Sequence, residues 1–143
     1  MKKTILICLA IVVLVAVSYM MFNNTCRRGA IRLELKEPGH TGAVSLAKSD
    51  IKSVVLQRMP YSTAKYQQFE TIISVTPEAK QSLYSFSKSN SGKNVLVYFC
   101  DKLFADVVIV GPTDELRISS MNIDVEQTLK QLKKVTNNVE YKK

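Results

Sequence analysis

The sequence predicts an α+β protein, with an antiparallel sheet of five or six strands, two helices on one face, and one preceding N-terminal transmembrane or signal helix. Three observations predict this class. Short runs of β-branched and aromatic residues alternate with polar ones, two segments carry apolar residues at helical spacing, and an uncharged apolar run opens the chain. The length of 143 residues leaves room for one folded domain.

The first element is the uncharged apolar run from Ile5 to Phe22. As a helix at about 1.5 Å per residue it would extend roughly 27 Å, which is close to the hydrocarbon thickness of a bilayer. The expected division of the chain is a membrane anchor or signal peptide at 1–22, a linker at 23–29 and a periplasmic domain at 30–143.

The charges before this run predict its orientation. Lys2 and Lys3 favour a cytoplasmic start, which predicts a single-pass inner-membrane protein with its C-terminal domain in the periplasm. The alternative is signal cleavage before Tyr19, because Ala16 and Ser18 are the small residues that a signal peptidase requires. That alternative predicts a soluble periplasmic protein.

The net charge of the chain is +8, and +6 remains without the first 22 residues, whose charged side chains are Lys2 and Lys3. A basic domain at a membrane would meet anionic lipid and attract acidic polypeptides, although excess lysine is also common on solvated surfaces. The basic residues are scattered, so no nucleic-acid partner is expected. Cys26 and Cys100 are the two cysteines beyond the apolar run, and a disulfide between them is a hypothesis.

Alternating apolar residues predict the first strand, because Ile31, Leu33 and Leu35 are separated by charged side chains. Further strands are expected at 54–56, at 69–75, in a hairpin of 95–100 and 104–110 with Asp101 and Lys102 in its turn, and at 116–120. The segments 38–42 and 59–67 are expected to be loops.

Two helices are predicted by their start signals. Thr76 can cap the first, Pro77 suits its first position, and Gly92 follows its expected end. Asp124 precedes the second helix, with Gln127 three residues later as in a capping box. The expected inner-face residues are Ala79, Leu83 and Phe86 in the first helix, and Val125, Leu129, Leu132 and Val135 in the second.

A succession of short segments then resembles the head subdomain of the first periplasmic domain of SecD, a subunit also found fused as SecDF. The segments are Ser49–Val54, Val75–Lys80, Gly92–Val95, Asp101–Ala105, Ile118–Ser120 and Val125–Gln127. The resemblance implies a stand-alone, single-anchor module that contacts polypeptides emerging from the Sec channel. Two positions depart from the family, since Lys102 replaces the usual turn glycine and Asp106 the usual proline.

The residue inventory predicts no enzyme, and no catalytic, cofactor or metal site. His40 is the one histidine of the chain, so a Ser-His or Cys-His pair has no independent support. Acidic side chains near the predicted turns could collect a cation, but acids in turns are usually solvated. These are Asp101, Asp106, Asp114 and Glu115.

Two functions from different classes follow. The first is a membrane-tethered module that binds exported polypeptides as an accessory to Sec-dependent export or envelope assembly, with candidate contacts Tyr61, Tyr66, Tyr98 and Phe104. Tyr98 and Phe104 could instead pack within the sheet. The second is a dedicated periplasmic partner-binding protein, such as an immunity or inhibitory factor, on the same scaffold.

Overall fold

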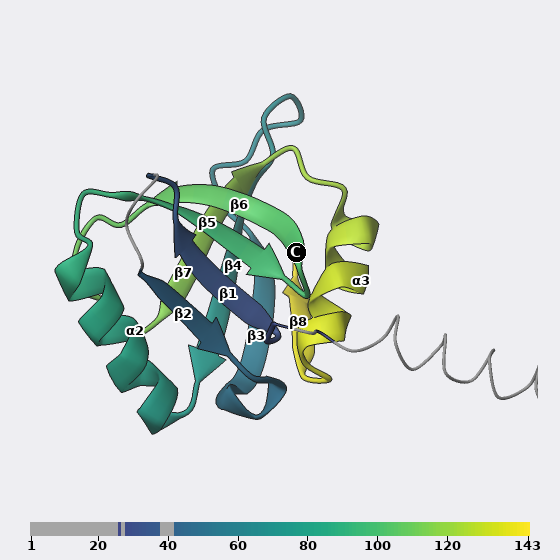
Figure 1. The fold of residues 1–143 in the computed structure, drawn as a ribbon. Coiled ribbons are helices and arrows are strands. Elements are labelled where there is room, and N and C mark those ends of the chain that lie inside the picture. Colours follow the sequence, from purple (N-terminus) through teal and green to yellow (C-terminus); the bar gives the residue numbers. More distant parts are fainter. Residues whose placement is uncertain (1–25, 27, 38–41) are drawn as a thin grey trace, which may run out of the picture.

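A computed structural model describes residues 26, 28–37 and 42–143 (Figure 1). Its elements in chain order are β1 (Ile31–Leu35), β2 (Ala43–Leu46), the 3-10 turn η1 (Lys48–Asp50), β3 (Ile51–Arg58), β4 (Gln68–Val75), α2 (Pro77–Ser89), β5 (Asn94–Phe99), β6 (Lys102–Val108), β7 (Leu116–Met121), α3 (Val125–Val135) and β8 (Val139–Lys142). The described part is therefore a mixed α+β fold, as the sequence predicts.

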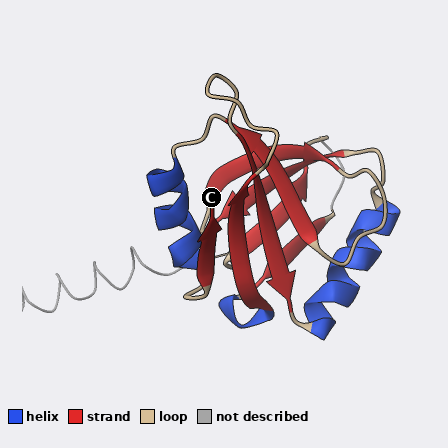
Figure 2. Cartoon of the chain, turned by 180° about the vertical axis from the view of Figure 1, so that it is seen from behind, coloured by secondary structure: helices blue, strands red, loops and turns tan. Residues whose placement is uncertain are grey.

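The strands form two four-stranded sheets, with the orders β2-β1-β5-β6 and β7-β4-β3-β8. Neighbouring strands are antiparallel, except that β8 runs parallel to β3. Figure 1 shows the first sheet lying in front of the second, and Figure 2 shows the same stack from behind. One core lies between them, because buried residues of both sheets belong to a single cluster.

The expectation of one sheet of five or six strands with both helices on one face is wrong. Each sheet covers the apolar face of the other, so neither needs a layer of helices. In β4, for example, Phe69, Ile73 and Val75 are buried against this shared core. The sequence does not predict the short edge strands β2 and β8, because four residues give too little alternation to separate a strand from a loop.

The two helices lie on opposite sides of the stacked sheets (Figures 1 and 2). Helix α2 contacts β2 and buries Leu83, whereas α3 contacts β5, β3 and β8 and buries Leu132 and Val135. Each helix thus closes one side of the space between the sheets.

Both predicted helix starts are confirmed. The Thr76 hydroxyl accepts a hydrogen bond from the Ala79 N–H at 3.4 Å, and Pro77 is the first helical residue. The Asp124 carboxylate accepts one from the Gln127 N–H at 3.0 Å. Helix α2 ends at Ser89, and Gly92 follows with φ of +81°.

The predicted anchor at 5–22 and most of the linker lie outside the described residues, as does His40. Among the helices that are described, none is long and apolar enough to cross a membrane.

Candidate functional site

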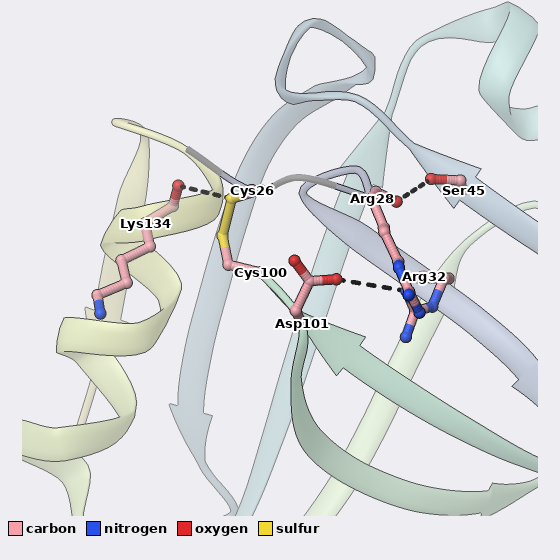
Figure 3. The surroundings of a disulfide bond; sticks show 7 residues. All are labelled: Cys26, Arg28, Arg32, Ser45, Cys100, Asp101 and Lys134. Atoms are coloured by element: carbon pink, nitrogen blue, oxygen red, sulfur yellow. Dashed lines mark hydrogen bonds and ion pairs between the residues drawn. A yellow bond between two sulfur atoms is a disulfide. The ribbon is translucent and has the colours of Figure 1, made fainter. Parts of the chain in front are cut away.

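The turn of the β5–β6 hairpin determines where two functional candidates point. Its two residues are Cys100 and Asp101, one position earlier than the sequence suggested, with φ of +45° and +66°. Two-residue hairpins favour such positive φ values because they match the right-handed twist of the strands. The turn directs Cys100 toward α3 and Asp101 toward Arg32 (Figure 3).

A disulfide joins Cys26 to Cys100 in the structure, with their Cα atoms 4.4 Å apart. The Cys26 sulfur lies 4.0 Å from the carbonyl oxygen of Lys134 in α3 (Figure 3). This is a packing contact, because a disulfide sulfur has no hydrogen to donate. The bond therefore ties the segment before β1 to the hairpin turn, beside the C-terminal end of α3.

Arg32 occupies the surface of β1 next to this turn. Its Nε lies 2.8 Å from the Glu34 carboxylate as an ion pair without hydrogen-bond alignment, and its NH1 donates to Asp101 at 3.3 Å. The guanidinium also lies 4.6 Å from the centre of the Tyr98 ring. Since only 12% of the Arg32 side chain is exposed, this cation covers the ring and is held by two carboxylates.

The four aromatic candidates lie in two separate elements. Tyr61 and Tyr66 are exposed in the 59–67 loop, which projects from the sheets at the top of Figure 1. Tyr98 lies under Arg32, and the ring of Phe104 stacks on Phe99 with centroids 4.1 Å apart. Among the described residues no ring contact joins the loop pair to the hairpin pair.

The acidic residues considered for a cation are each occupied by a basic side chain. Asp101 contacts Arg32, Asp106 contacts Lys36, Asp114 contacts Lys80 and Glu115 contacts Arg117. No group of three or more potential metal ligands occurs among the residues the structure describes.

An apolar cleft of about 350 Å³ lies where β6, at the edge of one sheet, approaches β7, at the edge of the other. Its lining residues are Leu33, Leu83, Phe86, Ser87, Val95, Val107, Val108, Ile109, Val110, Gly111, Pro112, Thr113, Glu115, Leu116 and Arg117. This volume is at the lower end of ligand pockets and suits one or two apolar side chains.

The wall of the cleft formed by residues 111–115 is fastened to α2. The Thr113 N–H donates to the hydroxyl of the buried Ser87 at 2.8 Å, and the Thr113 hydroxyl donates to the Glu115 carbonyl at 2.7 Å. The first bond connects the turn to the helix and the second lies within the turn, so this wall of the cleft is held in place before any ligand arrives.

Charge lies at the rim of the cleft. Arg117 Nε donates to Glu115 at 2.9 Å, and its NH1 lies 3.6 Å from the Glu70 carboxylate. The hydrogen bond and charge of Glu115, aided by Glu70, raise the pKa of Arg117 above its ordinary value. The arginine therefore stays charged, with its guanidinium paired to two carboxylates. The other side chains that line the cleft are mostly apolar.

Sequence reasoning missed the cleft because its walls come from five elements far apart in the chain. One feature of the sequence could have indicated apolar surface at this place. Residues 107–110 are four consecutive aliphatic residues, whereas a half-buried strand alternates. Val108 is 56% exposed and Val110 95% exposed, so this run places apolar surface beside the cleft.

No protein-family model and no curated protein matches the chain. Two similar solved structures are those of SecDF, described as a membrane component that enhances protein export, and of SecDF in its super-membrane-facing form. In each case the identity is 14%, the TM-score is 0.48 and 71% of this chain is covered. The chain spans 44% and 13% of those proteins, and the predicted match to the SecD head subdomain stays a prediction.

Proposed function

We propose that residues 30–143 are a non-enzymatic polypeptide-binding module that receives an extended segment along β6 and an apolar side chain in the neighbouring cleft. The module is held at the periplasmic face of the inner membrane by residues 5–22 and assists Sec-dependent export or envelope assembly. The observation that carries the proposal is the position of a preformed apolar cleft beside the edge of β6, which no described strand pairs with.

The β6 edge has the hydrogen-bonding groups for strand addition. Within the described part of the chain, strand β6 pairs with β5 on one side only and is the last strand of its sheet. The Ile109 N–H donates to the Lys93 carbonyl at 3.1 Å on the β5 side. Because N–H directions alternate along an antiparallel strand, those of Val108 and Asp106 point to the open side. An added strand can therefore bond to the backbone there.

The cleft determines which side chains of a bound polypeptide are favoured. Val107 and Val108 of β6 line it, so alternate side chains of an added strand would reach its mouth. Its apolar walls favour aliphatic or aromatic side chains, because their burial removes apolar surface from water. The backbone hydrogen bonds to β6 do not depend on the sequence of the bound strand. This combination favours many unfolded chains with moderate affinity over one particular partner.

The disulfide supports an exported location, because disulfides persist in oxidising compartments such as the periplasm. The membrane anchor itself is proposed from the apolar run at 5–22, and cleavage before Tyr19 would leave the same module soluble.

The test uses the full chain in detergent and a fluorescently labelled secretory protein kept unfolded by reduction and carboxymethylation. We expect binding with a Kd of about micromolar order by fluorescence anisotropy. Gly111→Leu should weaken it at least tenfold, because Gly111 lines the cleft and has open space for a side chain. Val108→Pro should do the same by removing an outward N–H.

Gln81→Leu is the matched control, because it adds the same side chain at an exposed position of α2 outside the cleft. Absence of binding, or equal binding by all variants, would refute the proposal. Capture of one tight stoichiometric partner with no affinity for unfolded chains would instead support a dedicated partner-binding protein.

A further inference from the structure

Four exposed cations lie on the chain segments that meet at the disulfide, and we name them the basic collar: Arg28, Lys102, Lys133 and Lys134. Figure 3 shows Lys134 and Arg28 on either side of the bond between Cys26 and Cys100, with the Lys134 carbonyl oxygen facing the bond and its ammonium group directed away from it. Lys133 precedes Lys134 at the end of α3, and Lys102 directly follows the hairpin turn. Three separate parts of the chain, each with an exposed cation, thus adjoin the disulfide.

No carboxylate neutralises the basic collar within the described residues. Asp101 directly follows Cys100 in the hairpin turn, and its carboxylate already contacts Arg32. Other lysines nearby in sequence do have partners, as Lys130 has Glu126 at 2.8 Å. The basic collar therefore keeps its charge available for an external anion.

The length of the chain before Cys26 determines how far this charge can lie from the predicted membrane span. Only three residues separate Phe22 from Cys26. Four residue steps extend at most about 14 Å. Because the disulfide connects Cys26 to the hairpin turn, the same limit applies to the turn and its surroundings. The lipid headgroup layer is about 5–7 Å thick and the Debye length is about 8 Å, so the distances are comparable.

We infer that the basic collar docks on anionic lipid headgroups and holds the domain with its disulfide side toward the bilayer. Each Lys or Arg at such a surface raises the ratio of docked to undocked protein about fivefold. This inference rests on the predicted span at 5–22 and is independent of polypeptide binding by the cleft. It assigns the disulfide the role of transmitting the position of the anchor to the folded domain.

The test places the full chain in nanodiscs of neutral lipid, or of neutral lipid mixed with phosphatidylglycerol, each with nitroxide-labelled headgroups. The protein has no tryptophan, so Asn137→Trp introduces a single reporter at an exposed position two residues beyond α3. We expect stronger nitroxide quenching of this tryptophan in the anionic discs than in the neutral ones. The difference should disappear at high salt.

Charge reversal then identifies the residues. Lys133→Glu with Lys134→Glu should lower the docked-to-undocked ratio more than tenfold, and the excess quenching should be lost. Lys48→Glu with Lys88→Glu is the matched control, because both lysines are exposed on η1 and α2. Tyr61→Trp reports on the distant 59–67 loop and should show no excess quenching. Equal quenching of Asn137→Trp in both lipids, or no effect of reversal at Lys133 and Lys134, would overturn the inference whatever the outcome for the cleft.

Discussion

Replacing Gly29 by alanine should destabilise the fold more than any other single methyl addition at a described glycine. Gly29 has φ of +102°, which side-chain-bearing residues rarely adopt, and an added Cβ would lie 2.2 Å from the Ser45 hydroxyl and 3.1 Å from the Leu46 carbonyl. The backbone strain costs about 1–2 kcal/mol. Displacing Ser45 also breaks its 2.6 Å hydrogen bond to the Arg28 carbonyl, at about 1 kcal/mol. We expect a loss of about 2–4 kcal/mol.

Urea unfolding followed by circular dichroism measures this loss, and two further variants separate strain from collision. Gly92→Ala should cost only about 1–2 kcal/mol, because φ is +81° but no atom lies within 4 Å of the added Cβ. In a Ser45→Ala background the cost of Gly29→Ala should fall by about 1 kcal/mol, since the colliding hydroxyl is gone. Equal costs at Gly29 and Gly92, with no coupling to Ser45, would refute the steric reasoning.

Three further predictions concern the disulfide, the core and a helix cap. Alkylation of the native protein should leave Cys26 and Cys100 unlabelled until reductant is added, and labelling of both thiols without reductant would contradict the disulfide. Cys26→Ser should lower the free energy of unfolding by up to about 4 kcal/mol, because the disulfide closes a loop of 74 residues. Leu132→Ala should cost about 2–5 kcal/mol in urea unfolding because the side chain is fully buried, whereas Leu103→Ala, at 57% exposure, should change stability by less than about 0.5 kcal/mol. Thr76→Ala should cost about 1 kcal/mol by the same assay, and an unchanged midpoint would mean that its cap is not formed in solution.

The local elements were largely readable because their signals are local. Thr76 and Pro77 marked a helix start through groups that meet its first turn, and the alternation of Ile31 with Leu33 marked one buried face of a strand. The arrangement of these elements was not readable in the same way. Alternation shows that one face of a strand is covered, but it does not show whether a helix or a second sheet covers it.

Some features of the candidate site can be predicted from the sequence, and others cannot. Cys26 and Cys100 could be proposed as partners by counting cysteines, and the excess of basic residues could be counted as well. The cleft forms where β6 and β7, which belong to different sheets, come close together. No pattern of residues along the chain indicates that these two strands meet. Similarly, the pairing of Asp101 with Arg32 depends on a hairpin turn one residue earlier than the pattern suggested.

What the sequence by itself determined is the α+β class, both helices with their caps, most of the strands and the apolar run at 5–22, because these depend on residues close together in the chain. Only the tertiary structure decided that there are two stacked sheets, that an apolar cleft adjoins the β6 edge, and that the segments carrying the basic collar meet at the disulfide. The physical reason is that packing between sheets and the grouping of charges depend on contacts between distant segments, and binary patterning specifies only which face is buried.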